Sequence, residues 1–244
     1  MVRVVSMVPS WTETLLEAGV EVVGRTRFCI HPPSSVVRVG GTKDWKLDRV
    51  RSLKADLLVL DREENPLFMS EDSGLPVWAS HIRSLENVAP ALRDLSGVLG
   101  CGLLRDWSAR WEAVAAAPAS DGFPGIVEWG RRPSSEVRSV VYVIWRDPWM
   151  AVGPETFIGS VLAKTGYPVF GFAEKYPVVD FADFDRSSTL LLFSSEPYPF
   201  LRKREGLAEL GFPYAFVDGE SFSWFGVRAL RFLESALFGR CSSL

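Results

Sequence analysis

Cys29 and His31 are the two residues whose types and spacing come closest to a chemical site. A thiolate and a neutral imidazole can ligate a soft or borderline metal ion, and two positions apart in an extended loop their side chains point the same way. Because no third ligand is identified, other interpretations stay open. His31 could be an axial ligand to a metal held in a macrocycle, the pair could act as nucleophile and base, or both could be ordinary loop residues.

Arg25 and Arg27 flank the same loop. Their guanidinium groups could orient a carboxylate or phosphate of a ligand, or could pair with Asp44 or Glu63. The second histidine, His81, follows a predicted strand, and we expect it to be structural or exposed.

Glu63 and Glu64 follow another predicted strand, and Glu196 follows one in the second half of the chain. They could do acid–base work, dock onto a basic partner or simply be solvated. The sequence has no GxxxxGK[ST], GxGxxG, GxSxG or HExxH pattern, so it offers no phosphate loop, nucleophile elbow or zincin motif. A Cys/His-dependent enzyme stays open as the alternative, of another class, to a non-enzymatic protein.

Strand patterns alternate with helix patterns in both halves of the chain. This alternation predicts an α/β fold with parallel sheets and helices on both faces. Ser10 with Glu13 predicts a capping box at the first helix. The strands are expected at 3–8, 21–24, 55–61, 76–79, 136–145, 189–193 and 214–217, and the main helices at 11–18, 47–53, 154–165, 201–210 and 225–238.

One stretch, Leu85–Ala117, has apolar residues at nearly the helical period of 3.6. It predicts a helix, or a broken helix, that joins two α/β lobes. Gly97, Gly100 and Gly102 weaken its middle. The expected division is an N-terminal lobe over 1–84, one long backbone helix over 85–117 and a C-terminal lobe over 118–244. The segment 117–133, rich in Pro, Gly and Ala, is expected to be a junction.

The chain has 244 residues, a net charge of −3 and 47% hydrophobic residues, so it can bury a core and is not expected to bind nucleic acid. Its three cysteines, Cys29, Cys101 and Cys241, indicate no disulfide framework and suit a reducing compartment. No signal-peptide pattern or membrane-spanning apolar run is present. The expected location is cytoplasmic as sequenced, or periplasmic or at the cell surface if a signal has been removed.

Aromatic residues gather in the loops that follow the predicted strands. Ligands of parallel sheets bind beyond the carboxyl ends of the strands, so these aromatic side chains could line a pocket for a large flat ligand. They could instead anchor the loops structurally. The loop aromatics are Trp11, Phe28, Trp45, Trp145, Trp149, Tyr198, Phe222 and Trp224.

Three segments, RVVSMVPSWTETLLEAG, VVGRTRFCIHPP and VGGTKDWKLDRVRSLKADLLVL, resemble the first lobe of the helical-backbone (class III, TroA-like) substrate-binding proteins. That group contains the vitamin B12-binding periplasmic protein and the siderophore- and haem-binding proteins of ABC importers. In the second half, WMAVGPETFIGSVLAKTGYPVF, SSEPYPF and VDGESFSWFG look like the second lobe of the same family.

The resemblance implies two lobes with an aromatic cleft between them and a metal chelate as ligand: above all a cobalamin-like corrinoid, otherwise haem or a ferric chelate. It implies no catalytic cofactor. It also implies an ABC permease as partner, docked through one acidic residue on each lobe, for which Glu63 or Glu64 and Glu196 are the candidates. Because no signal or lipid-attachment cysteine stands near the start, a cytoplasmic chelate or haem carrier or sensor without a permease is the alternative. The ligand contacts carried over are Trp11, Phe28, His31, Trp45, Glu64, Trp149, Tyr198 and Trp224.

Overall fold

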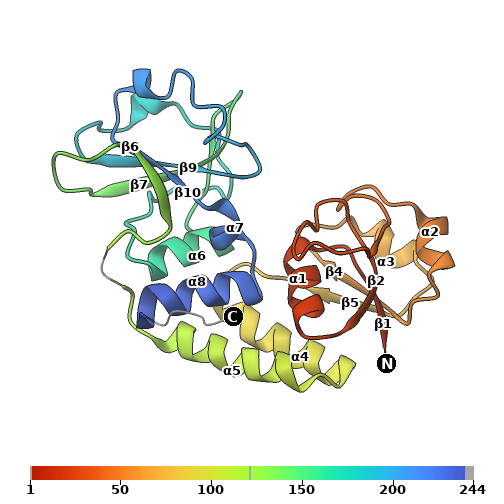
Figure 1. Ribbon diagram of the computed structural model, residues 1–244. Coiled ribbons are helices and arrows are strands. Elements are labelled where there is room, and N and C mark those ends of the chain that lie inside the picture. Colours follow the sequence, from red (N-terminus) through yellow and green to blue (C-terminus); the bar gives the residue numbers. More distant parts are fainter. Residues whose placement is uncertain (1, 121, 240–244) are drawn as a thin grey trace. The chain divides into compact units, whose positions relative to one another are not determined.

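The computed structural model describes residues 2–120 and 122–239; Cys241 lies outside them. The described residues form two five-stranded sheets with helices, and the predicted α/β class is confirmed (Figure 1). The chain divides into two compact units. Of the described residues, unit 1 contains 2–115 together with Trp224–Leu230, and unit 2 contains those of 116–223 together with 231–239.

The sheet of unit 1 is parallel throughout, in the order β3-β2-β1-β4-β5. Its strands are β1 (Arg3–Ser6), β2 (Glu21–Arg25), β3 (Val37–Arg38), β4 (Leu57–Asp61) and β5 (Val77–Ser80). The helices of this segment are α1 (Pro9–Glu17), α2 (Leu47–Ser52) and α3 (Phe68–Asp72).

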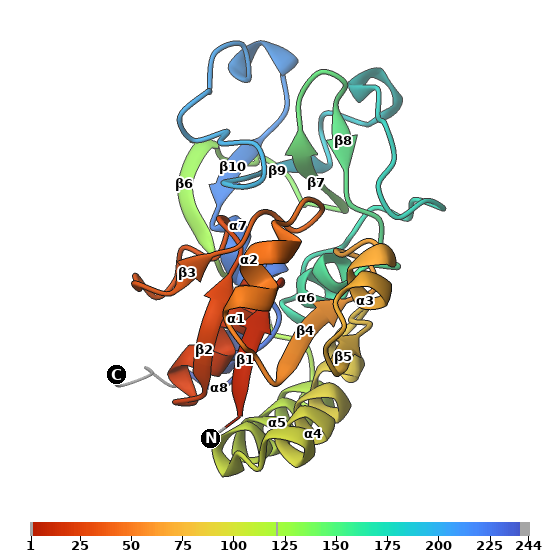
Figure 2. The same cartoon turned by 90° about the vertical axis from the view of Figure 1, so that its right-hand side faces the viewer.

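Helices cover both faces of this sheet, as Figure 2 shows. Leu58 and Leu60 belong to a buried cluster with Val50 of α2 and Met69 of α3. On the other face, Trp78 of β5 meets the indole of Trp11 in α1, with ring centroids 5.5 Å apart. Because consecutive residues of a strand face opposite sides, the apolar residues 57–60 of β4 can serve both layers.

The predicted capping box at the first helix is wrong. Helix α1 begins at Pro9, with Val8 as its N-cap and no side-chain cap. Proline suits the first helical position because the amide that it lacks would be unpaired there anyway. Glu13 instead turns its carboxylate to Arg228, with the Arg228 Nε 2.9 Å from Glu13 Oε2.

Residues 85–117, expected to form one long helix, instead form a 3₁₀ turn and two separate helices. A 3₁₀ turn η1 (Leu85–Asn87) leads into α4 (Val88–Leu99), and α5 (Gly102–Ala116) follows. Gly100 has φ +63°, which ends a right-handed helix. The Ser108 hydroxyl donates to the Ala89 carbonyl at 2.7 Å. In one straight helix these residues would lie about 28 Å apart, so α4 and α5 fold against each other.

The sheet of unit 2 has the order β6-β10-β9-β7-β8, with a parallel centre and antiparallel edge strands. Its elements are β6 (Ile126–Arg131), β7 (Ser139–Trp145), β8 (Met150–Ala151), α6 (Phe157–Lys164), η2 (Phe181–Asp183), β9 (Thr189–Ser194), η3 (Ala208–Leu210), β10 (Tyr214–Val217) and α7 (Gly219–Ser223). Helix α8 (Val227–Phe238) begins in unit 1 and ends in unit 2.

Two predictions for unit 2 are wrong. The segment expected as a junction contains β6, which pairs with β10. The helix expected over 201–210 is a loop that ends in the short turn η3, because Gly206 (φ +76°) and Gly211 (φ +82°) adopt the left-handed conformation. The loops with η2 and η3 cover one face of the sheet, and α6 and α7 lie on the other (Figure 1).

No helix within the described residues is long and apolar enough to cross a membrane.

Candidate ligand-binding site

The carboxyl edge of the sheet in unit 1 is the natural place for a site. The chain leaves β1 in the middle of the sheet and returns on either side of it, to β2 and to β4. Loops diverge at such a switch point and leave room for a ligand. Three of these loops are joined by one side chain: Asn65 donates to the carbonyls of Met7 (3.3 Å) and Thr42 (2.8 Å), and its Oδ1 accepts from the Asp61 amide at 2.8 Å.

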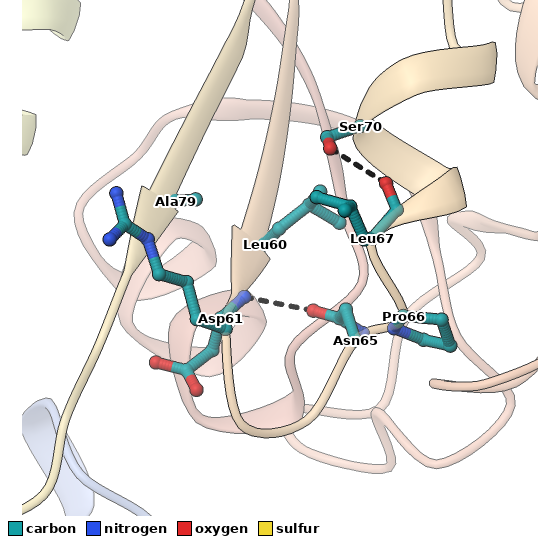
Figure 3. Close-up of a pocket in the computed structure, with 8 residues that line it drawn as sticks. Leu60, Asp61, Asn65, Pro66, Leu67, Ser70 and Ala79 are labelled. Carbon is teal, nitrogen blue, oxygen red and sulfur yellow. Dashed lines mark hydrogen bonds between the residues drawn. The ribbon is translucent and has the colours of Figure 1, made fainter.

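A cavity of about 440 Å³ opens at the ends of β4 and β5, beside the start of α3 (Figure 3). Leu60 and Ala79 come from the strands, and Pro66 and Leu67 come from the segment that leads into α3. Leu67 is 72% exposed. The remaining lining residues are Asp61, Arg62, Asn65 and Ser70.

The loop after β2 is held from inside by Arg25. This arginine is 4% exposed, and its guanidinium donates to the carbonyls of Cys29, Ser34 (2.7 Å) and Val36 (3.4 Å). Of the two arginines expected either to orient a ligand or to pair within the protein, Arg25 therefore uses its donors within the loop. Arg27 pairs with Asp44 through two hydrogen bonds, of 2.8 and 3.0 Å.

Cys29 and His31 have different surroundings, although they are two residues apart. The Cys29 thiol is buried and lies 3.1 Å from the hydroxyls of both Thr12 and Thr26. Burial raises the pKa of this thiol, so the neutral form is favoured over the thiolate that a metal or a nucleophilic attack requires. Among the described residues, no group of three or more His, Cys, Asp or Glu is placed to hold a metal ion.

His31 is partly buried and meets the edge of Trp224, with ring centroids 5.7 Å apart. Trp224 in turn lies under the guanidinium of Arg228, at 5.3 Å from its centroid, and Arg228 is paired with Glu13. The two predicted contacts His31 and Trp224 are thus brought together. Phe28, in the loop with His31, is 48% exposed and carries the Arg27 guanidinium over its ring at 4.7 Å.

Trp11 was expected to face a ligand, but it belongs to the core of unit 1. Its ring is fully buried between Trp78 and Phe225, and its indole N–H donates to the Ser80 hydroxyl at 2.8 Å. Every side of the ring is occupied by protein, so Trp11 supports the edge of the sheet and does not present a face to a ligand.

Trp45 is partly buried and meets Phe68 of α3 edge to face, with centroids 6.4 Å apart. Phe68 is 40% exposed, and with Leu67 it extends the apolar surface beside the cavity. Sequence reasoning missed Leu67 and Phe68. The signal was present in ENPLFM, where two large apolar residues follow an Asn-Pro turn directly after a strand loop. Glu64 is partly buried in that same loop.

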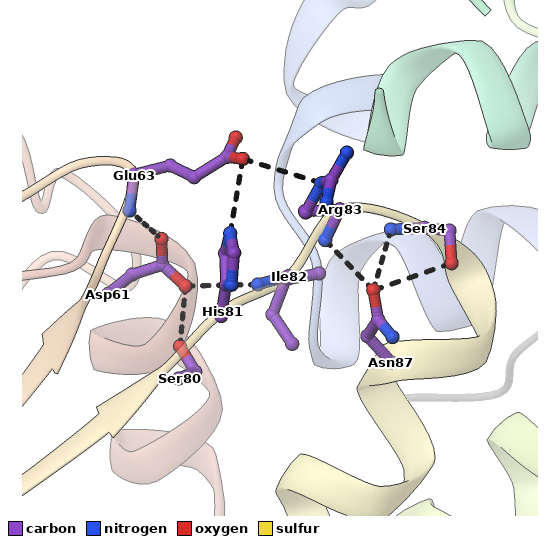
Figure 4. Close-up of polar contacts among 8 residues, drawn as sticks. All are labelled: Asp61, Glu63, Ser80, His81, Ile82, Arg83, Ser84 and Asn87. Atoms are coloured by element: carbon purple, nitrogen blue, oxygen red, sulfur yellow. Dashed lines mark hydrogen bonds and ion pairs between the residues drawn. The ribbon is translucent and has the colours of Figure 1, made fainter. Parts of the chain in front are cut away.

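Glu63, one of the predicted docking acids, is paired within unit 1. Its Oε1 lies 3.3 Å from His81 Nε2 and 3.9 Å from Arg83 Nε (Figure 4). Its backbone amide donates to Asp61 Oδ1 at 2.9 Å. The expectation that His81 is structural or exposed fits this position, where the ring is 45% exposed.

The aromatic contacts predicted in unit 2 lie against its core. Trp149 stacks on Phe200, with centroids 6.1 Å apart, and meets the edge of Phe181 at 5.0 Å. Tyr198 packs on Phe200 at 4.5 Å and lies under the ammonium of Lys203 at 5.1 Å. Both keep part of their surface exposed. Trp149 also lines an open hollow of about 580 Å³ on the loop-covered face.

Glu196, the second predicted docking acid, follows β9 in a polar cluster of unit 2. Its Oε1 accepts from the Ser223 hydroxyl at 2.5 Å, and its carbonyl accepts from Ser194 at 2.6 Å. The phenol of Tyr142 donates to Ser194 beneath this turn, and burial raises the pKa of that phenol.

No protein-family model matches the chain, and no curated protein matches it in sequence. Solved structures do. The periplasmic vitamin B12 binding protein of Vibrio cholerae superposes with a TM-score of 0.69 at 16% identity, covering 96% of this chain and 94% of that one. A periplasmic heme-binding protein of Pseudomonas aeruginosa gives 0.67 at 20% identity, covering 99% and 94%. The heme-binding protein RhuT of Roseiflexus gives 0.67 at 18%, covering 98% of each chain.

The chain has the fold of the class III periplasmic binding proteins. The predicted resemblance is confirmed, and it extends over nearly the full length of this chain and of each solved structure compared with it. At these identities the likeness concerns the fold.

Proposed function

We propose that this protein binds a metal-bearing tetrapyrrole, a cobalamin-like corrinoid or haem, without chemical turnover, as the substrate-binding component of an ABC-type uptake system. The observation that carries this proposal is the fold shared along the chain with a vitamin B12 binding protein and with heme-binding proteins. The burial of the Cys29 thiol, which raises its pKa, supports a binding role over a Cys/His-dependent enzyme.

The carboxyl edge of unit 1 supplies the chemistry such a ligand needs. Phe28 offers an exposed aromatic face, and His31 is the imidazole that could reach a central metal from the loop that Arg25 holds. Aromatic surface supplies affinity through apolar burial, and an axial imidazole adds a metal bond. The predicted contacts Trp45, Glu64, Trp149, Tyr198 and Trp224 remain part of the proposal.

The test is a titration of the purified chain with cobalamin and with haem, followed by visible spectrum and thermal shift. A ligand at about 100 times its dissociation constant should raise the free energy of unfolding by about 2.7 kcal/mol. His31→Ala is compared with His81→Ala, the matched control, since the chain has only two histidines. We expect His31→Ala to change the visible spectrum of the bound tetrapyrrole and His81→Ala to leave it unchanged. No shift with either ligand contradicts the proposal.

The permease is the second part of the proposal, with Glu63 and Glu196 as the docking acids. Reversing both charges (Glu63→Lys with Glu196→Lys) should weaken binding to permease-containing vesicles and leave ligand affinity unchanged. Fractionation of the full gene product separates this role from the alternative, a cytoplasmic chelate carrier or sensor. A chain found only in the cytoplasm, with no affinity for the vesicles, would favour the carrier.

A further inference from the structure

We infer that the cavity at the ends of β4 and β5 in unit 1 is a subsite for an amphipathic anion, an apolar group bearing one carboxylate, sulfonate or phosphate, with Arg62 as the residue that binds the charge. The argument starts from which lining groups are still available to a ligand. A buried polar side chain whose hydrogen bonds are already made to protein offers little to an incoming molecule.

Three of the four polar lining side chains are already engaged. Asp61 is 1% exposed, and its carboxylate accepts from the Glu63 amide (2.9 Å), the Ser80 hydroxyl (2.7 Å) and the Ile82 amide (3.3 Å). Asn65 uses both ends of its amide to join loops, as described above. The Ser70 hydroxyl donates to the Leu67 carbonyl at 2.7 Å (Figure 3).

Arg62 is the exception. Its side chain is exposed, and across residues 2–120 and 122–239 its guanidinium makes no hydrogen bond or ion pair. The neighbouring acids Asp61 and Glu63 do not pair with it. Asp61 is buried and accepts from Glu63, Ser80 and Ile82, and Glu63 is directed to His81 and Arg83 (Figure 4). The lining therefore offers a ligand one free cation and an otherwise apolar surface.

This combination defines the ligand class. A guanidinium binds carboxylate, sulfonate or phosphate oxygens through paired N–H donors. Leu60, Pro66, Leu67 and Ala79 would contact an apolar body, and about 440 Å³ lies within the usual range of roughly 300–1,000 Å³ for small-molecule sites. Where this rests on the proposed function, either tetrapyrrole carries such an anion: haem has carboxylates at its edge, and cobalamin has one phosphate beside its neutral amides.

The first experiment uses probes that do not depend on the proposed function. The full chain is titrated with anilinonaphthalene sulfonate and with phenylnaphthylamine, which share an aromatic body and differ in the anionic group. The variants are Arg62→Gln, Leu67→Glu, which places a like charge at the exposed mouth, and Arg105→Gln. Arg105 is an exposed arginine of α5 outside the cavity, so it controls for the loss of one positive charge. Far-ultraviolet circular dichroism and melting temperature check the fold of each variant.

We expect Arg62→Gln and Leu67→Glu to weaken binding of the sulfonate probe about tenfold. Arg62→Gln should leave the affinity for the neutral probe unchanged, and Arg105→Gln should leave the affinities for both probes unchanged. Equal affinities of wild type and Arg62→Gln for the sulfonate, or equal losses in Arg62→Gln and Arg105→Gln, would overturn the inference. So would the same loss for both probes in Arg62→Gln.

A second arm compares haem with its dimethyl ester, which lacks the free carboxylates. A preference for haem that disappears in Arg62→Gln places a haem carboxylate at this subsite. Binding of both with equal affinity in wild type keeps the proposed function and overturns the haem assignment. If the sulfonate result holds but neither haem nor cobalamin binds, the proposed function fails and the anion subsite stands.

Discussion

The carboxyl edges of the two sheets use similar residues in different ways. In unit 1 the loops keep Phe28 and Leu67 exposed, and buried groups such as Arg25 and Asn65 hold the backbone behind them. In unit 2 the loop aromatics pack on one another, with Phe200 touching both Trp149 and Tyr198. A surplus of loop aromatics therefore has two physical explanations. One is a surface for a ligand, and the other is a core built by loops that replace helices on one face of a sheet.

The largest expected effect tests this contrast directly. Trp149→Ala should lower the free energy of unfolding by about 3 kcal/mol, because it removes a ring packed against Phe181 and Phe200. Phe28→Ala should change it by less than about 0.5 kcal/mol, because that ring is half exposed. Chemical denaturation measures both. Phe28→Ala should weaken ligand binding more than Trp149→Ala does. The proposed difference between the two units is wrong if Phe28→Ala destabilises the chain as much as Trp149→Ala.

An intermediate effect concerns the residues behind the exposed loop. Arg25→Lys should lower the free energy of unfolding by about 2 kcal/mol, because an ammonium cannot satisfy three carbonyls that a planar guanidinium reaches. Arg27→Lys, in the same loop but exposed, is the matched control.

Nuclear magnetic resonance separates positioning from general destabilisation. The His31 ring lies against Trp224, so its proton signals carry a ring-current shift. We expect Arg25→Lys to move the His31 signals and leave those of His81 in place. Movement of both, or of neither, would show that Arg25 does not specifically position the loop.

The smallest effect concerns pH. Because burial raises the pKa of the Cys29 thiol above its ordinary value of 9.0, the folded chain keeps a proton that the unfolded chain releases. The free energy of unfolding should therefore fall as pH rises from about 9 through the folded pKa. Cys29→Ser removes this contribution, and urea denaturation between pH 7 and 10 should give a shallower decline for the variant. Tyr142 and Tyr167, whose pKa values burial also raises, add a further decline above pH 10 in both proteins.

Hydrophobic periodicity and the positions of turn-forming residues were enough to predict many of the strands and helices. The buried runs at 57–61 and 189–193 are strands in the structure, and the helix pattern near the C-terminus became α8. Failures occurred where local signals competed with tertiary pairing. Ser10 and Glu13 have capping-box spacing, yet Glu13 is drawn to Arg228, which is 215 residues away in the chain.

The sequence predicted which loops form the candidate site, but not which side chains in those loops contact one another. Asn65 and Arg62 have no unusual spacing, and their roles depend on which neighbouring groups are satisfied after folding. Cys29 and His31 are two residues apart, a spacing that would allow both to ligate one metal ion. The loop turns one side chain inward to Thr12 and the other to Trp224.

The sequence by itself determined the alternation of strands and helices, and hence the edge of each sheet where loops gather, because hydrophobic period and backbone handedness are local properties. Only the tertiary structure decided which loop residues are free. Trp11 and Arg25 became fully engaged within the protein, while Phe28 and Arg62 remained available. The physical reason is that burial and hydrogen-bond satisfaction are set by residues distant in the chain, which no spacing along the sequence records.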